Sequence, residues 1–314
     1  LIDVKRNRIN RFGQALYINI PTTAAFLFRR QTLPSGVSAL TEAFVTSQNG
    51  LLDCGQTPDL CRPRGTRIKG SGRTPGAWVV YLGRETQAGP NPNEVRSTVS
   101  QVLVHPDYNN TLFNNDIALL KLQSPVQFND FIRPVCLASN VSQFHTSTPC
   151  WATGWGNLRS NLSLPASQPL QEVPVPVVGE NQCACGYRLE ADANITNEMI
   201  CAGEENRGTC QGDSGGPLQC KQASNWIQAG ITSFGVPCAR AGFPEVYARV
   251  SQFQTWITEQ VAGATVSFVT FRSNGTDADN SFVCRSPNTA SSVAPELTFV
   301  IIIAAMLLQN TMTQ

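Results

Sequence analysis

One short stretch, residues 212–217, constrains this chain more than any other. Its sequence is Gly-Asp-Ser-Gly-Gly-Pro, with Cys210 and Cys220 on either side. Glycine adopts positive φ and lets a second backbone approach closely, so this composition predicts a tight turn that exposes one hydroxyl. An attacking hydroxyl needs backbone N–H groups beside it, because they stabilise the oxyanion that it creates. Gly-x-Ser-x-Gly alone is also common in surface loops, but the full six-residue pattern favours Ser214 as a nucleophile.

This segment and the upstream sequence Asn115-Asp116-Ile117-Ala118-Leu119-Leu120 together resemble the trypsin/chymotrypsin-like serine proteases. The resemblance covers roughly residues 54–261. It implies that Ser214 is the nucleophile, that Asp116 orients a catalytic histidine, and that the N–H groups of Gly212 and Ser214 form the oxyanion hole. It implies no cofactor and no metal.

The general base that this family requires is missing from its expected place. The family has several strands and an Ala-Ala-His-Cys stretch between its activation site and the region that resembles Trp78, but here only nine residues separate Ile68 from Trp78. The chain has two histidines, His105 in a surface stretch and His145 in a Ser/Thr-rich loop, and we expect both to be solvated. A general base must lie within about 3 Å of the hydroxyl that it deprotonates. The triad is therefore predicted to be incomplete.

The N-terminal part is expected to comprise a leader and a propeptide. Residues 1–53 have no assigned structure; arginines interrupt any signal-peptide core, so the segment is either disordered or a divergent signal region. Residues 54–67 resemble a short propeptide, with Arg67-Ile68 as the activation bond. The new amino group of Ile68 would pair with Asp213, and breaking such a buried ion pair costs about 3–5 kcal/mol. The following sequence departs from the family's Ile-Val-Gly-Gly, so a basic linker over 62–73 is the alternative.

Cysteines and glycosylation sites favour the secretory pathway. The chain has 11 cysteines, and Asn-x-Ser/Thr sites begin at Asn109, Asn140, Asn161, Asn194 and Asn274. The resemblance implies the disulfides Cys54–Cys136, Cys150–Cys220, Cys183–Cys201 and Cys210–Cys238. Three cysteines remain without an assigned partner: Cys61, Cys185 and Cys284. The net charge of +1 argues against nucleic acid as a partner; protein or peptide substrates and protease inhibitors are expected instead.

Short strands separated by turn residues predict an all-β fold. They are expected at 99–104, 117–122, 151–154, 170–178, 227–234 and 245–250, and apolar residues at helical spacing follow, with Ser251 as the N-cap. With the resemblance, this indicates two antiparallel Greek-key barrels of trypsin-like type over residues 68–261, closed by a C-terminal helix. The first barrel is expected to be truncated, which would leave strand edges unpaired.

Three residues are predicted to line the specificity pocket. Gly208 stands six positions before the nucleophile, where trypsin-like members carry an Asp. Gly235 would keep the entrance open. Glu245 replaces a glycine of the family pattern and would project a carboxylate from the side wall, which favours both apolar and basic substrate side chains. The alternative has Glu245 in solvent or paired with Arg240.

The segment after residue 261 is expected to be a polar stalk over 262–296 and a hydrophobic tail over 297–314. The apolar run at 297–308 is shorter than the roughly 20 residues that a membrane-spanning helix needs. Small residues followed by a polar spacer and a hydrophobic end favour a GPI-attachment signal, similar to tails of membrane-tethered proteases of the prostasin and testisin type. A true membrane span and a buried tail are the alternatives.

Two functions follow from these observations. In the first, the protein is an extracellular, membrane-tethered serine endopeptidase, and this sequence has lost the segment with the histidine. In the second, the chain is a non-catalytic binding protein that keeps the peptide groove. In either case this chain is predicted to be inactive.

Overall fold

The computed structural model describes three strands near the N-terminus, at residues 15–19, 24–27 and 43–46, and most of the chain after residue 77. It describes residue 75 and residues 78–284, except 110, 130, 133, 191–192, 224, 236–237, 262–265 and 267. The chain divides into two compact units, Leu1–Phe282 and Val283–Gln314, and the fold described below is that of the first unit. Within the described residues, no helix has the length and apolar character needed to cross a membrane. The hydrophobic tail expected at 297–314 lies outside these residues.

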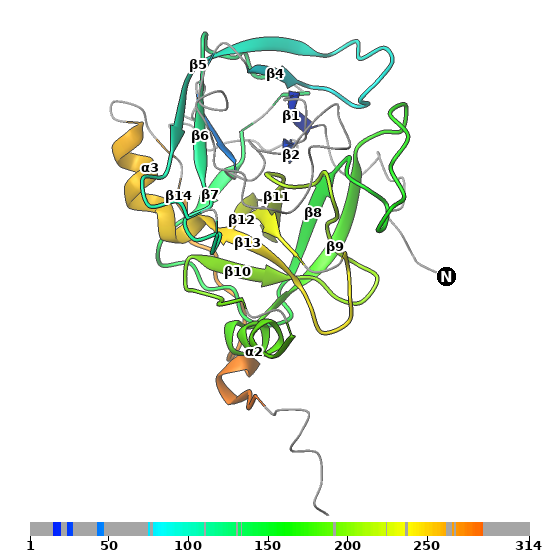
Figure 1. Ribbon diagram of the computed structural model, residues 1–314. Coiled ribbons are helices and arrows are strands. Elements are labelled where there is room, and N and C mark those ends of the chain that lie inside the picture. The colour runs from blue at the N-terminus through cyan, green and yellow to red at the C-terminus, as the bar shows by residue number, and fades with distance from the viewer. Residues whose placement is uncertain are drawn as a thin grey trace, which may run out of the picture. The chain divides into compact units, whose positions relative to one another are not determined.

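A six-stranded antiparallel sheet forms the first half of the fold (Figure 1). Its strands, in spatial order, are β2 (Ala24–Leu27), β1 (Ala15–Asn19), β4 (Val79–Leu82), β5 (Val95–Val104), β6 (Ala118–Leu122) and β3 (Ala43–Thr46). Alternate residues of β4 are buried, as expected for a strand with one face on a core. The core of this half includes Val80, Leu82 and Leu120.

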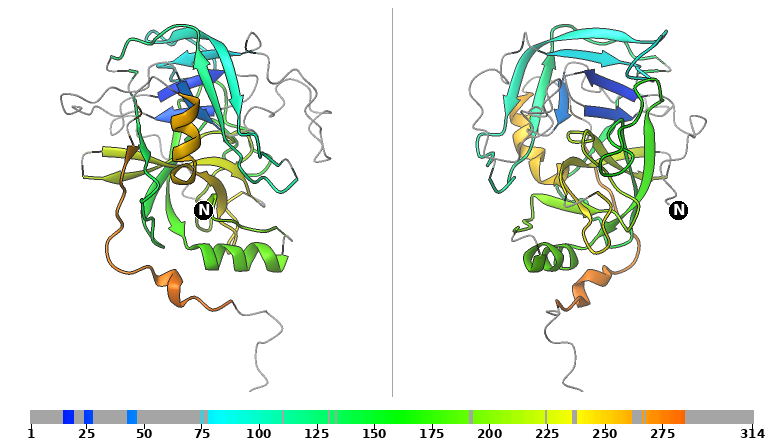
Figure 2. Two further views of the ribbon diagram at one scale, coloured as in Figure 1. Left: turned by 90° about the vertical axis from the view of Figure 1, so that its left-hand side faces the viewer. Right: turned by 45° about the vertical axis from the view of Figure 1, so that its right-hand side comes forward.

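Three strands of this sheet, β1, β2 and β3, come from residues 1–53, which were predicted to be a leader. β1 pairs with β4, with Tyr17 opposite Tyr81, and β3 pairs with β6, with Val45 opposite Leu119. The other edges of β4 and β6 pair with β5. The expectation of unpaired edges on these strands is therefore wrong. In Figure 2 the blue strand β1 lies beside β4, and β2 lies on the other side of β1.

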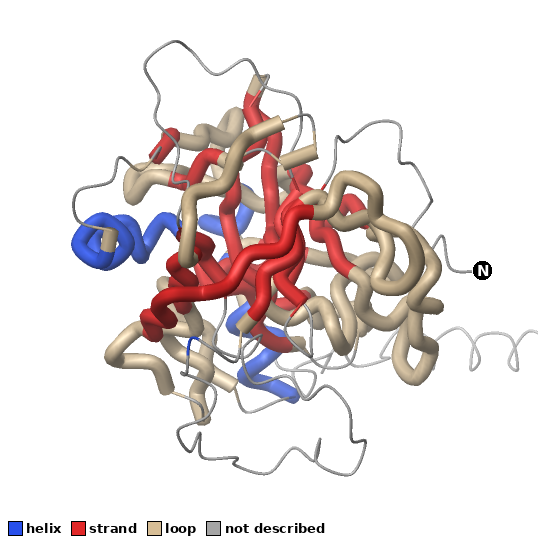
Figure 3. Tube along the Cα trace, turned by 90° about the horizontal axis from the view of Figure 1, so that it is seen from above, coloured by secondary structure: helices blue, strands red, loops and turns tan. Residues whose placement is uncertain are grey.

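The second half is a closed barrel. Its ring consists of β8 (Pro149–Gly154), β9 (Gln171–Val178), β10 (Met199–Ala202), β13 (Glu245–Arg249), β12 (Asn225–Phe234) and β11 (Pro217–Gln222). β11 pairs with both β12 and β8, which closes the ring. Closure removes exposed sheet edges. Seen from above, the strands occupy the middle of the fold, and one helix lies at its left edge (Figure 3).

This mostly β fold, with its barrel and its C-terminal helix, confirms the predicted fold class. The helix α3 (Gln254–Gln260) follows a 3₁₀ turn, η2 (Val250–Phe253). Ser251 lies inside that turn, and no side chain caps α3, so the predicted N-cap is wrong. The helix α2 (Glu180–Glu190), between β9 and β10, was not predicted.

β6 lies between the two halves of the fold, and each of its two faces packs against a different core. Ala118, Leu120 and Leu122 face the first core, whereas Ile117 and Leu119 pack in a second cluster with residues of β12, β13 and α3. The residue before Ile117 therefore stands at the junction of the two cores.

Residues 268–282 form a segment that we call the C-terminal strap, and they are docked on the barrel. β14 (Phe268–Val269) pairs in parallel with β7 (Cys136–Ala138), which itself pairs with β12. Phe271 is buried and its ring stacks on Phe144. The strap continues to η3 (Ala278–Ser281), the orange turn below α2 in Figures 1 and 2. The expectation of a free polar stalk is wrong for these residues, because backbone pairing and aromatic packing hold them.

Three of the four predicted disulfides are present: Cys150–Cys220, Cys183–Cys201 and Cys210–Cys238. Cys136 is a buried free thiol, so its predicted bridge to Cys54, which lies outside the described residues, is not formed. Cys185 is disulfide-bonded, and so is Cys284.

Candidate active site

The predicted nucleophile, Ser214, lies in a tight turn that backbone hydrogen bonds hold in place. Gly212 and Gly215 have φ of 90° and 80°, a region that L-residues rarely adopt, so glycine is required at both. Gly215 N–H donates to the Thr232 carbonyl at 2.8 Å, and Gly216 N–H donates to the Asp213 carbonyl at 2.9 Å. These bonds tie the turn to β12 and leave Ser214 half-buried at its apex.

The two N–H groups predicted to form the oxyanion hole have no hydrogen-bond acceptor among the described residues. Within the described part of the chain, neither the N–H of Gly212 nor that of Ser214 donates a hydrogen bond, and the Ser214 hydroxyl has no partner. Donors that are already oriented and unpaired can stabilise a developing oxyanion without reorganisation. The turn therefore has the donors that acyl transfer needs.

Asp213 points away from Ser214 and into the protein. The carboxylate is 1% exposed; Oδ1 accepts from Gly156 N–H at 2.8 Å and Oδ2 from Cys210 N–H at 2.9 Å. A Cβ on Gly154 or Gly156 would overlap this carboxylate, so both glycines make room for it. Buried charge must be hydrogen-bonded to be tolerated, and two backbone donors meet part of that requirement. Arg67 and Ile68, predicted as the activation site, lie outside the described residues.

Asp116 is fixed by a bulge in the other half of the fold. It is 1% exposed, and its Oδ2 accepts a 2.5 Å hydrogen bond from Ser233 Oγ. In the pairing of β12 with β13, Thr232 opposes Tyr247 and Phe234 opposes Val246, so Ser233 is an extra residue. Such bulges re-aim one side chain, and this one supplies the donor for Asp116.

The sequence did not predict the hydrogen bond from Ser233 to Asp116, because the two residues are 117 positions apart. The charge of Asp116 also acts on a neighbour: burial first, and then the negative charge of Asp116, raise the pKa of Tyr108 well above its usual value.

Both histidines of the chain lie elsewhere. His105 packs against Phe253 and Trp256 beside α3, with ring centroids 5.6 and 5.0 Å away, and burial lowers its pKa, with Asp107 acting in the opposite direction. It is therefore packed against an aromatic pair instead of being solvated. The backbone N–H of His145 donates to Ser273 Oγ of the C-terminal strap. Within the described residues, neither histidine hydrogen-bonds to Ser214.

The three predicted specificity residues, Gly208, Gly235 and Glu245, come together with Gly203, which was not predicted. We call this cluster of four residues the Glu245 site. A Cβ on Gly208 would lie 2.2 Å from both carboxylate oxygens of Glu245, and one on Gly203 would lie 2.5 Å from Oε2. The carboxylate thus occupies the space that side chains at these positions would take. Gly235 is also adjacent, 3.2 Å from Cγ by the same measure.

Glu245 is buried and only partly hydrogen-bonded. It is 4% exposed, so the alternative in which it turns to solvent is wrong; the guanidinium of Arg240 lies over the Phe243 ring. Oε1 accepts from Ala239 N–H at 2.9 Å, whereas Oε2 is buried and accepts no hydrogen bond from the described residues. Burial raises the pKa of Glu245 to about 7, although backbone hydrogen bonds lower it. A buried polar atom without a partner costs free energy, so Oε2 would gain from a donor that enters the site.

Comparisons with known proteins agree with this geometry. A family model described as trypsin matches residues 70–257. A tryptase of Mus musculus is 43% identical over 169 residues, which make up 52% of this chain and 62% of the tryptase. The match therefore spans less than two thirds of that relative.

Proposed function

This chain belongs to the trypsin family of serine proteases, and from that premise we propose that it binds peptide segments at the Ser214 site without hydrolysing them. One observation carries the proposal: the nucleophile turn and Asp116 are formed, but both histidines of the chain lie away from Ser214. Without a general base the hydroxyl stays protonated and is a weak nucleophile. The groups that orient a peptide carbonyl, the N–H groups of Gly212 and Ser214, do not depend on that base.

The sheet register supports the absence of the base. β3 occupies the edge of β6, and its last residue, Thr46, lies opposite Ala118, two residues after Asp116. The next residues in the sequence are Ser47-Gln48-Asn49. None of them carries an imidazole. On the other edge of β6, β5 also ends opposite Ala118, at Val104, and is followed by His105. The ring of that histidine packs against Phe253 and Trp256. The proposal is tested by measuring peptide binding and product release on the same sample.

A second candidate function is favoured by the arrangement of Asp116 and of the N–H groups predicted to form the oxyanion hole. Asp116 still accepts a hydrogen bond from Ser233, and among the described residues nothing accepts from the N–H groups of Gly212 and Ser214. A form of the protein that contains the family's histidine segment would then be a serine endopeptidase. Asp213 would be the partner of the amino group of Ile68 after cleavage at Arg67.

For such a histidine-containing form, we expect cleavage after both aromatic and Lys residues, with Glu245 responsible for the Lys part. A library of peptide substrates measures this profile. A profile confined to Arg and Lys, or one that is unchanged by Glu245→Gly, would show that the specificity residues are assigned wrongly.

The setting that we propose is extracellular. Three disulfides in the barrel suit an oxidising compartment. Partners are then protein or peptide ligands and protease inhibitors, and a GPI-type tether at residues 297–314 would hold the protein at the cell surface. Detection of the protein at the surface of intact cells, and its release by a phospholipase specific for phosphatidylinositol, tests the tether.

The Glu245 site is expected to bind a small cation such as benzamidine in a pH-dependent way. The carboxyl is protonated below its pKa of about 7 and ionised above it, so affinity for the amidinium should rise as pH increases through this range. From one unit below to one unit above the pKa, the ionised fraction rises about tenfold, and affinity with it. Calorimetric titration measures the trend. Glu245→Gln is the matched control, because it keeps the shape and removes the charge; pH-dependent binding that persists in this variant contradicts the assignment.

A further inference from the structure

The N-terminus of α2 has no capping side chain of its own. The residue before this helix is Gly179, whose carbonyl accepts the first intrahelical bond, from Cys183 N–H at 2.9 Å. The first N–H groups of a helix have no partner inside the helix, and a Ser, Thr, Asp or Asn at this position usually provides one. Glycine has no side chain to do so. The acceptor must therefore come from another part of the chain.

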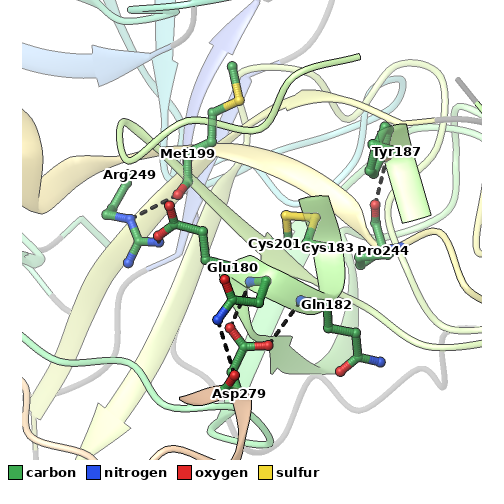
Figure 4. Close-up of a disulfide and its surroundings, with 10 residues drawn as sticks. Glu180, Gln182, Cys183, Tyr187, Met199, Cys201, Pro244, Arg249 and Asp279 are labelled. Atoms are coloured by element: carbon green, nitrogen blue, oxygen red, sulfur yellow. Dashed lines mark hydrogen bonds and ion pairs between the residues drawn. A yellow bond between two sulfur atoms is a disulfide. The ribbon is translucent and has the colours of Figure 1, made fainter. Parts of the chain in front are cut away.

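Asp279 of the C-terminal strap provides that acceptor (Figure 4). Its Oδ2 accepts from Asn181 N–H at 2.7 Å and its Oδ1 from Gln182 N–H at 3.0 Å. The side-chain amide of Asn181 also donates to the Asp279 carbonyl. Asp279 is only 6% exposed, and its negative charge is favourable at the positive end of the helix dipole.

The Asp279 side chain occupies the space that a side chain at position 179 would need. A Cβ on Gly179 would lie about 2.1 Å from Asp279 Cγ. A capping side chain at position 179 and the Asp279 carboxylate thus exclude one another, and this chain uses the remote one. The strap lies beyond the residues that the trypsin model matches, 70–257, so the cap is supplied by a part of the chain that follows the family domain.

The other end of α2 supports the Glu245 site. Tyr187 is fully buried, and its hydroxyl donates to the Pro244 carbonyl at 2.8 Å (Figure 4). Its ring packs edge-on against Phe234 at 5.8 Å. Pro244 directly precedes Glu245, and Phe234 directly precedes Gly235. Two backbone segments of the Glu245 site therefore rest on one side chain of α2.

We propose that Asp279 is a positioning residue for the Glu245 site. By capping α2, it holds Tyr187 against Pro244 and Phe234, and so sets the orientation in which the Glu245 carboxylate meets a cationic ligand. This inference rests on the proposed function, since it takes the Glu245 site to be one that binds cations. It assigns to the C-terminal strap an effect on ligand binding in addition to its packing on the barrel.

Other contacts keep α2 attached to the barrel when the cap is removed. Cys183 is bonded to Cys201 of β10, and Glu180 lies 3.7 Å from the guanidinium of Arg249, which also donates to the Met199 carbonyl (Figure 4). These contacts fix α2 to β10 and β13 without bonding the N–H groups of Asn181 and Gln182. Loss of Asp279 should therefore shift α2 and leave the barrel folded.

The test is benzamidine affinity, measured by calorimetry on the full chain above pH 7, where Glu245 is ionised. Asp279→Ala is expected to bind benzamidine about fivefold more weakly, the scale of one helix cap. The double variant Gly179→Asp/Asp279→Ala moves a carboxylate to the helix's own N-cap position, in the space that Asp279 vacates, and should recover most of the affinity. Phe271→Leu is the matched control, because it loosens the strap where it contacts Phe144, away from α2. It should lower the melting temperature and leave the affinity unchanged.

The outcomes separate this inference from the proposed function. If wild-type protein binds benzamidine through Glu245 and Asp279→Ala binds equally well, the positioning role is wrong. It is also wrong if Phe271→Leu weakens binding as much as Asp279→Ala does, or if the double variant fails to recover affinity while it remains folded. If the wild-type protein does not bind benzamidine, or if Glu245→Gln binds it as well, the cation site of the proposed function fails and this inference fails with it.

Discussion

The purified protein should hydrolyse peptide substrates about a millionfold more slowly than a trypsin-family enzyme with a complete triad. Removal of the histidine from a serine protease triad costs about 10⁶ in turnover, or roughly 8 kcal/mol of transition-state stabilisation. Here the Ser214 hydroxyl has no hydrogen-bond partner among the described residues, so nothing there removes its proton. Product release from a fluorogenic peptide measures turnover. Labelling by a fluorophosphonate probe measures the reactivity of the Ser214 hydroxyl.

The control is Ser214→Ala, which should have the same residual rate as the unchanged chain. A second arm distinguishes a missing base from an unformed site: free imidazole, added at high concentration, should increase labelling of the unchanged chain and not of Ser214→Ala. Robust labelling without imidazole that disappears in Ser214→Ala would contradict the incomplete triad. No response to imidazole would contradict a formed nucleophile turn.

Deletion of residues 1–53 should have the second large effect, on the stability of the first sheet. The deletion removes β1, β2 and β3, and with them the partners of β4 and β6. Each of these strands would then have an unpaired edge, which favours aggregation. The barrel keeps three disulfides, each worth about 2–4 kcal/mol. We therefore expect limited proteolysis to cut the deletion variant between residues 78 and 121, and a disulfide-linked core from Cys150 to Val261 to survive.

A deletion of residues 285–314 is the control, because it removes none of the described strands. Its digestion pattern over residues 78–121 should match that of the full chain, which we expect to be protected there. Equal cleavage of this region in the full chain and in the variant without residues 1–53 would show that the N-terminal strands do not protect the sheet.

The nucleophile turn and most strands could be predicted from the sequence, because their signals are local. Six consecutive residues specify the turn at Ser214, and alternating apolar residues specify strands such as β9, where alternate positions are buried. Glu245 and Gly208 were assigned to the same pocket, and they are neighbours in the structure. These predictions need only neighbours in the chain or a pattern that the family shares.

The elements that were missed depend on contacts that are distant in sequence. α2 begins after a glycine and carries two cysteines and Gly186, so nothing local indicates a helix start; its cap comes from 98 residues away. Residues 268–282 have a polar composition typical of a linker, and they are fixed by the pairing of β14 with β7, the stacking of Phe271 on Phe144 and the burial of Asp279. β1 and β3 likewise acquire a structural role only through their pairing with β4 and β6.

In the first sheet, strands that precede the Arg67-Ile68 bond pair with strands that follow it. Three strands precede that bond in the chain and three follow it, so hydrolysis there would leave the sheet assembled from two polypeptides. Because Cys136 is a free thiol, no bridge from it would link the pieces. Without another disulfide between the two pieces, the sheet would become a bimolecular complex, whose population falls on dilution as the law of mass action requires. In this chain, the cleavage that matures other family members would instead release a dissociable fragment.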